Sequence, residues 1–184
     1  MLEYLHDFPV IAAAKDSDGL EKAIDSKSDV IFLLYGDVCN IAGLVQKIKN
    51  KGKIAIVHID LIDGLSGRDV CVKFIKENTK TDGIISTKSS VIKTAREQGF
   101  ITIQRFFLID SRAFENTIKS AVGNKSDFIE ILPGCMPKII KKITSIVDVP
   151  VISGGMIYDK EDIISALGNG AIAVSTTNPE LWDQ

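Results

Sequence analysis

The 184-residue sequence lacks the cysteine pattern of a disulfide-stapled or zinc-binding protein. It has only three cysteines, Cys39, Cys71 and Cys135, which are odd in number, widely spaced and without a CxxC pair. This usage fits a reducing cytoplasm better than an oxidising compartment. We therefore expect all three cysteines to be packing residues.

The sequence also has no long apolar segment. Glu3, His6 and Asp7 interrupt the N-terminus, whereas a signal peptide needs a cationic start and an unbroken apolar run. The apolar run from Val30 to Tyr35 is far shorter than the roughly 20 residues that cross a bilayer. We expect a cytoplasmic protein with no membrane partner.

Neither sign of charge is in clear excess. The chain has 22 basic and 24 acidic residues, a formal net charge of −2 and a pI near 5.7. This balance argues weakly against nucleic-acid binding, although a local basic patch stays compatible with it. The cluster Lys47, Lys49, Lys51 and Lys53 is interpreted as a solvated helix C-terminus, where lysines complement the helix dipole.

Several catalytic motifs are absent as well. The sequence contains no Ser-His-Asp order, no HExxH, no Walker loop and no GxGxxG after its first strand, which weakens the common hydrolase, metalloprotease and nucleotide-binding interpretations without excluding enzymatic chemistry. We expect no catalytic set, no metal and no resident cofactor. His58 lies inside a predicted strand, so it is interpreted as a packed, hydrogen-bonded histidine rather than a general acid or base.

What the sequence does contain is a regular alternation of apolar strands and amphipathic helices. The predicted strands are Pro9–Ala13, Val30–Tyr35, Ile54–Ile59, Gly83–Ser86, Ile101–Phe106, Phe128–Leu132, Val149–Ile152 and Ala171–Val174. Their continuous hydrophobicity is typical of strands buried on both faces of a parallel sheet. Eight βα repeats predict a small single-domain (β/α)₈ TIM barrel over residues 1–184. At this length we expect minimal loops and one helix reduced to a turn.

Helix starts are predicted from capping residues. Ser17, Asn40, Ser66 and Asp159 precede amphipathic segments as plausible N-caps, and Asp69 completes a capping pattern with Ser66. Further helices are predicted from Ser111 and from Pro137, a favourable first-turn proline, and a short closing helix is predicted over Pro179–Trp182.

The last two strands end in residues suited to an anion. Glycines let backbone N–H groups approach an oxyanion, and hydroxyls followed by a helix start add further donors. In (β/α)₈ barrels, phosphate commonly binds at the loops after strands seven and eight. We therefore predict a phosphate-binding site after these strands, against the alternative of structural glycines and helix-capping threonines. Its residues are Ser153, Gly154, Gly155, Ser175, Thr176 and Thr177.

Charged residues collect at other strand ends, namely Asp60, Lys88, Arg105 and Glu130. A charge in an apolar strand is costly unless it is paired or used. Strand periodicity puts Asp60 on the same face as His58, but it does not say which face lines the barrel. These four residues form either a polar pocket at the barrel mouth or an ion-pair network that stabilises it.

Several motifs resemble those of a known family, the glycerol-3-phosphate-responsive antiterminators, also called glycerol uptake operon antiterminators, of bacteria. The similarity covers nearly the whole chain. It is carried by His58-Ile59-Asp60-Leu61-Ile62-Asp63-Gly64-Leu65, Asp82-Gly83-Ile84-Ile85-Ser86-Thr87-Lys88, Thr102-Ile103-Gln104-Arg105, Phe128-Ile129-Glu130-Ile131-Leu132-Pro133-Gly134, Ser153-Gly154-Gly155 and Ala171-Ile172-Ala173-Val174-Ser175-Thr176.

The resemblance implies a small barrel that senses glycerol 3-phosphate and, when liganded, binds the leader mRNA of a glycerol-metabolism operon so that transcription passes a terminator. Carried over residue by residue, it assigns the phosphate to Gly154, Gly155, Ser175 and Thr176. It also makes Asp60, Lys88, Arg105 and Glu130 the polar strand-end positions of the family.

Three hypotheses follow. The first is the ligand-gated transcription antiterminator, and the alternative is a (β/α)₈ enzyme acting on a small phosphorylated metabolite. The third is a binding barrel that passes its signal to a protein partner, and assembly into a homo-oligomer stays open under all three. Each predicts that Gly154→Asp abolishes phosphate-ligand binding and leaves the fold largely intact, since the change adds bulk and like charge.

Overall fold

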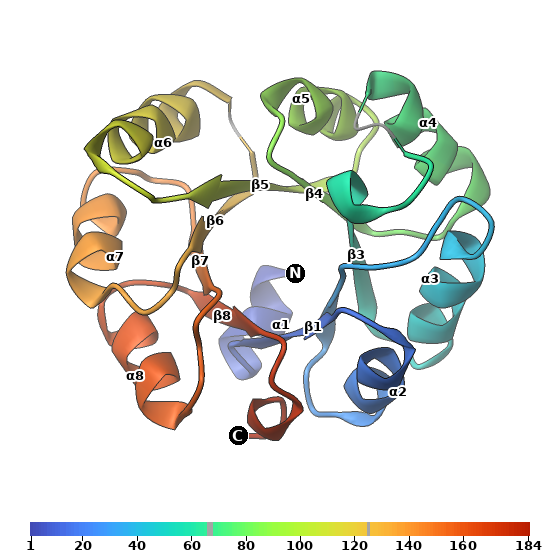
Figure 1. Ribbon diagram of the computed structural model, residues 1–184, viewed down its shortest axis with the longest axis horizontal. Coiled ribbons are helices and arrows are strands. Elements are labelled where there is room, and N and C mark those ends of the chain that lie inside the picture. Colours follow the sequence, from blue (N-terminus) through green and yellow to red (C-terminus); the bar gives the residue numbers. More distant parts are fainter. Residues whose placement is uncertain (66–67, 125) are drawn as a thin grey trace.

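The chain forms a closed barrel of eight parallel strands inside a ring of helices (Figure 1). The computed structural model describes residues 1–65, 68–124 and 126–184. The strands follow one another around the barrel in chain order, and the last pairs with the first. This architecture confirms the predicted (β/α)₈ TIM barrel.

The strands lie close to their predicted positions. They are β1 (Val10–Ala14), β2 (Val30–Leu33), β3 (Ile54–His58), β4 (Gly83–Ser86), β5 (Ile101–Phe107), β6 (Phe128–Leu132), β7 (Val151–Gly154) and β8 (Ala173–Thr176). The last two start two residues later than predicted, because the ladder to the neighbouring strand begins only at Val151 and Ala173. Their ends therefore reach further into the glycine and hydroxyl segments.

The helices alternate with the strands as expected. They are α1 (Leu2–Asp7), α2 (Ser17–Asp25), α3 (Ile41–Asn50), α4 (Asp69–Asn78), α5 (Ser89–Glu97), α6 (Ser111–Asn124), α7 (Pro137–Thr144) and α8 (Lys160–Gly168), with the short 3₁₀ helices η1 (Ile59–Leu61) and η2 (Pro179–Leu181). No helix within the described ranges is both long and apolar enough to cross a membrane.

The caps of these helices match the predictions in part. Asp159 caps α8 by accepting a hydrogen bond from the Asp162 amide, as predicted. Asp16 rather than Ser17 caps α2, since its carboxylate accepts a hydrogen bond from the Gly19 amide. The predicted cap Ser66 lies outside the described residues.

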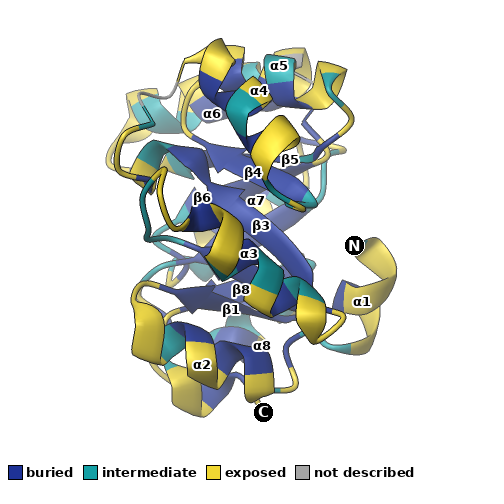
Figure 2. Cartoon of the chain, turned by 90° about the vertical axis from the view of Figure 1, so that its right-hand side faces the viewer, coloured by how far each residue is buried: buried dark blue, intermediate teal, exposed yellow. Residues whose placement is uncertain are grey.

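Figure 2 shows that the strands are buried, whereas the surrounding helices have exposed sides. Strand alternation divides the apolar side chains of the strands between two layers. One set fills the barrel interior, including Ile11, Phe32, Ile56, Ile103 and Ile152. The alternate residues face outward and pack under the helices, where each fully buried aliphatic side chain contributes roughly 1.5–3 kcal/mol.

The two ends of the chain complete this barrel. Helix α1, which the sequence pattern did not predict, places Leu5 in the interior cluster and covers the N-terminal end of the barrel. At the other end of the chain, β8 is followed only by η2, which confirms that one helix is reduced to a turn. The buried Trp182 anchors this turn, because its Nε1 donates a hydrogen bond of 2.9 Å to the Thr176 carbonyl.

The cysteine prediction was correct only for Cys71, which is buried. Cys39 and Cys135 are exposed. Each lies in a loop that follows a strand, beyond the segment that the barrel buries, so neither packs in the core.

The lysine cluster splits into two kinds of residue. Lys47, Lys49 and Lys51 pair with Glu21, Asp82 and Asp25 at 2.6, 2.7 and 2.9 Å. The solvated interpretation is wrong for Lys53, which is buried. Its ammonium group instead donates hydrogen bonds to the carbonyl oxygens of Ala23, Ser26 and Ser28, where α2 ends.

Replacing Lys53 tests this buried cap. Burial disfavours the charged ammonium group and lowers the pKa of Lys53. Removing this group in Lys53→Met would nevertheless leave three carbonyl oxygens without their hydrogen-bond donor. We expect the free energy of unfolding in urea to fall by about 2–4 kcal/mol, since hydrogen bonds to charged groups contribute about 1.5–3 kcal/mol each and act together here. The exposed Lys51→Met is the control and should change stability little. Equal losses in the two variants would contradict the cap.

Candidate functional site

A cavity of about 390 Å³ opens at the C-terminal mouth of the barrel. Arg105 and Glu130, from β5 and β6, form part of its wall. Gly155 and the segment Ser175–Asn178 supply the loops after β7 and β8. This is the end of the barrel where (β/α)₈ proteins place their ligands.

The residues predicted to bind phosphate divide into two groups. Gly155, Ser175, Thr176 and Thr177 line the cavity. Ser153 lies elsewhere, because its buried hydroxyl donates a hydrogen bond of 3.2 Å to the Gly134 carbonyl. The predicted loops are therefore at the cavity, but their side chains do not all face it.

Gly154 has a packing role that the sequence did not suggest. A Cβ at this position would overlap the Ser175 hydroxyl and lie 2.8 Å from Glu130 Oε1. The expectation that Gly154→Asp leaves the fold largely intact therefore stays a prediction, and the added side chain would require Ser175 and Glu130 to move. A side chain here would displace the groups on the cavity floor, so this substitution cannot separate binding from folding.

The floor of the cavity is a buried ionic network. Arg105 Nε donates a hydrogen bond of 2.5 Å to Glu130 Oε2, and the two residues lie opposite each other in the ladder between β5 and β6. Ser175 donates a hydrogen bond of 2.6 Å from its hydroxyl to Glu130 Oε1. Both carboxylate oxygens are thus engaged. The terminal nitrogens of Arg105 make no hydrogen bond within the described parts of the chain, which leaves them available to a ligand.

Asp60 and Lys88 are not among the described residues that line the cavity. The chain turns into η1 directly after His58, so Asp60 no longer follows strand alternation. Its carboxylate accepts hydrogen bonds from the Ser86 hydroxyl and from the amide and hydroxyl of Thr87. Lys88 is exposed at the start of α5, and its amide bonds the Ser86 hydroxyl. Of the four predicted polar residues, Arg105 and Glu130 line the cavity.

His58 is buried, as predicted, but its hydrogen bonding differs from the prediction. It follows Ile54 and Ile56, which belong to the interior cluster, so strand alternation points its ring into the barrel. Its Nδ1 has no hydrogen-bond partner among the residues that the structure describes. Burial, reinforced by the positive charge of Arg105 and opposed by Asp60, lowers the pKa of His58 to about 4.

The loop after β7 adds one backbone donor that the sequence analysis did not name, the amide of Met156. Gly155 and Met156 both have positive φ, of 72° and 57°. Such a backbone is strained for methionine, at a cost of about 1–3 kcal/mol. Within the described chain, the amides of Gly155, Met156 and Thr177 donate none of the hydrogen bonds found. Only the two consecutive glycines hinted at this geometry.

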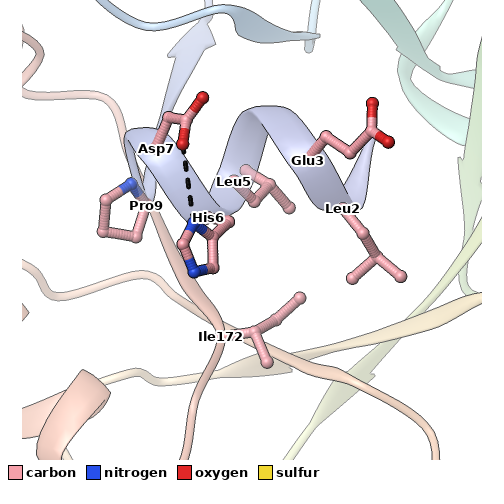
Figure 3. Close-up of a pocket in the computed structure, with 7 residues that line it drawn as sticks. All are labelled: Leu2, Glu3, Leu5, His6, Asp7, Pro9 and Ile172. Atoms are coloured by element: carbon pink, nitrogen blue, oxygen red, sulfur yellow. Dashed lines mark hydrogen bonds and ion pairs between the residues drawn. The ribbon is translucent and has the colours of Figure 1, made fainter.

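A second, larger hollow of about 860 Å³ lies at the opposite end of the barrel (Figure 3). It runs beside α1 and is bordered by Leu2, Leu5 and Ile172 together with Glu3 and Asp7. Two carboxylates oppose a phosphate ligand by like charge. The described residues also contain no group of His, Cys, Asp or Glu side chains placed to hold a metal. The mouth cavity is therefore the candidate site.

The fold and this mouth define a (β/α)₈ barrel with a polar cavity at the C-terminal ends of its strands. Residues 10–182 match the model of the family described as Glycerol-3-phosphate responsive antiterminator, and the chain belongs to this family. The family is named for regulation rather than for an enzymatic reaction, in agreement with the expectation that the protein is not an enzyme.

Individual relatives support the same assignment. The chain is 47% identical over 182 residues to the uncharacterized protein YgcP of Escherichia coli, covering 99% of this chain and 95% of YgcP. A glycerol uptake operon antiterminator regulatory protein from Listeria monocytogenes is 34% identical, with a TM-score of 0.92 and coverage of 96% of this chain and 95% of that one. A related Thermotoga maritima protein is 32% identical, with a TM-score of 0.83 and coverage of 94% and 96%.

More distant structures share the fold alone. The deoxyribose phosphate aldolase from Aeropyrum pernix has a TM-score of 0.70 at 13% identity, over 99% of this chain and 90% of that one.

The depressed pKa of His58 predicts an acid-sensitive fold. Because the folded pKa is about 4 and the ordinary value is 6.5, the unfolded chain binds the proton more readily. The contribution of His58 to stability is complete above pH 6.5 and should fall by about 1.4 kcal/mol per pH unit between 6.5 and 4. Urea unfolding at pH 7 and pH 5 measures this fall, which His58→Gln should remove.

The ring proton resonances of the two histidines give an independent check. The variant His6→Gln, changed at an exposed site, lacks one of the two resonances and so shows which one belongs to His58. A His58 resonance that titrates near pH 6.5 would contradict the lowered pKa.

Proposed function

We propose that the mouth cavity binds glycerol 3-phosphate, with the phosphate at the loops after β7 and β8. The observation that carries this proposal is the set of unused donors at one edge of the cavity, namely the amides of Gly155, Met156 and Thr177. Backbone amides approach a phosphate closely and need no desolvated cation to do so. Thr177, which is exposed, adds a hydroxyl on the same edge.

The floor of the cavity suits the other end of the ligand. A guanidinium group can donate a hydrogen bond to a ligand hydroxyl, and Arg105 lines the floor of the cavity while the fully buried Glu130 holds its guanidinium group in place. Ser175 holds the carboxylate in place through its own hydrogen bond. Glycerol 3-phosphate has a phosphate group that suits the amides at the cavity edge and two hydroxyl groups that suit the polar floor.

The same arrangement favours a sensor over an enzyme of phosphorylated metabolites. Both oxygens of Glu130 are engaged, and the low pKa keeps the His58 ring neutral and buried. The His58 ring is therefore not set up to donate a proton at neutral pH. The proposed output, supported by family membership, is antitermination in the cytoplasm through binding of the leader mRNA of a glycerol-metabolism operon.

A new charge at Thr177 tests the phosphate position. Thr177→Asp adds a carboxylate on the cavity edge without filling buried space, because this residue is exposed. We expect the affinity for glycerol 3-phosphate, measured by calorimetry, to fall at least ten-fold, or about 1.4 kcal/mol. The control is Ser145→Asp, which puts the same charge on an exposed residue just after α7, at the other end of the barrel. Equal affinities in the two variants would refute the assigned edge.

A gel-shift titration tests the regulatory output. The probe is the leader transcript of a glycerol-metabolism operon, titrated with and without glycerol 3-phosphate. We expect the ligand to tighten RNA binding of the unmodified protein, and Thr177→Asp to need more ligand for the same shift. Absent binding, or binding indifferent to the ligand, would rule out ligand-gated recognition of RNA.

A further inference from the structure

Several lysines on helices α2 and α3, or at the end of α3, are neutralised by neighbouring carboxylates. Lys22, Lys47 and Lys51 pair with Asp18, Glu21 and Asp25 at 2.6–2.9 Å. Helices α2 and α8 each carry more acidic than basic residues. These sides of the molecule offer little to an anionic partner.

Helix α7 is different. It has the sequence PKIIKKIT, and its charged residues are Lys138, Lys141 and Lys142, with no acidic residue. All three are exposed, whereas Ile140 and Ile143 are buried against the barrel. The spacing of three and four residues puts the lysines on one helix face, about 5–6 Å apart. None of them takes part in a salt bridge between residues that the structure describes.

Helix α6 extends this face. Figure 1 shows α6 and α7 as neighbours on the outside of the barrel, and the Lys142 ammonium group lies 4.7 Å from the centre of the Phe114 ring of α6. Arg112 and Lys119 are exposed on α6, against one exposed carboxylate of that helix, Glu115. The two helices together therefore form a local basic surface on a protein whose net charge is −2.

The basic surface is also connected to the mouth cavity. The loop between β6 and α7 is tied to the phosphate edge, because the Gly134 amide donates a hydrogen bond of 2.8 Å to the Gly155 carbonyl. The Ser153 hydroxyl bonds the Gly134 carbonyl from the same side. Helix α7 starts three residues after Gly134. A change at Gly155 on ligand binding therefore acts on the loop that positions α7.

From these observations we propose that the α6–α7 surface, made of Arg112, Lys119, Lys138, Lys141 and Lys142, binds the phosphate backbone of the RNA. The inference rests on the proposed function, and it assigns the RNA to the outer side of the barrel next to β6 rather than to the mouth. Unpaired lysines on one face suit a chain of phosphates, because each contact releases a condensed counterion. Sequence discrimination would come from other contacts, since phosphates carry no sequence information.

The test compares two triple variants that remove the same charge. Lys138→Gln, Lys141→Gln and Lys142→Gln together empty the α7 face, and Lys22→Gln, Lys47→Gln and Lys51→Gln together remove paired lysines of α2 and α3. Each set changes the formal net charge from −2 to −5 by removing three positive charges. Both are assayed with the leader transcript in the presence of glycerol 3-phosphate, over a range of salt concentrations.

We expect the α7 triple variant to bind the transcript at least ten-fold more weakly in about 0.1 M salt. The slope of log affinity against log salt should shrink by about 2, which corresponds to three lost contacts on a single strand. Its calorimetric affinity for glycerol 3-phosphate should be unchanged, which also shows that it is folded. The α2–α3 triple variant should behave as the unmodified protein does.

Other outcomes overturn the proposal in distinguishable ways. If both triple variants bind RNA as the unmodified protein does, or both weaken equally, the α6–α7 surface is not the RNA interface, although ligand-gated RNA binding survives. If the unmodified, liganded protein does not bind the transcript, the proposed function fails together with this inference. Binding of purified RNA polymerase that only the α7 variant loses would assign the surface to a protein.

Discussion

The buried ion pair between Arg105 and Glu130 constrains the rest of the mouth. Removing either partner from such a pair leaves an uncompensated charge, at a cost of about 3–5 kcal/mol, so every neighbour must accommodate both. The register of β5 and β6 brings the two residues opposite each other, and Ser175 on β8 satisfies the remaining carboxylate oxygen. Gly154 on β7 stays without a side chain because the carboxylate and the hydroxyl fill that space.

Residue type alone does not distinguish a side chain that binds phosphate from one that holds the cavity floor together, whereas the hydrogen bonds of this network do. Serines and glycines at the ends of strands seven and eight predict a phosphate cradle, yet Ser153, Gly154 and Ser175 largely hold the floor together. The donors left over are backbone amides, in a loop where Met156 takes a left-handed conformation. A sequence does not show which amides stay unpaired, because that depends on where each strand ladder ends.

The fold was more predictable than the site. Eight continuous apolar segments with helical patterns between them are enough to predict a parallel barrel, since few other folds bury that many strands on both faces. Alternation places His58 and Glu130 correctly relative to their strand neighbours, but it fails at Asp60, where β3 gives way to η1. Lys53 shows the same limit, because a lysine close to a solvated cluster in sequence is buried against the end of α2.

The net charge of the sequence did not indicate where unpaired basic residues gather on the surface. A value of −2 averages paired lysines around α2 and α3 with unpaired ones on α7, and only the folded arrangement distinguishes them. The unpaired lysines of α7 also lie on a helix that is connected directly to the cavity wall. The strand that carries Glu130 continues through Gly134 into the basic helix α7, and the Gly155 carbonyl at the edge of the cavity accepts a hydrogen bond from the Gly134 amide. A ligand that contacted Gly155 would therefore act on the loop in front of α7, which would give ligand binding a short physical route to the outer surface.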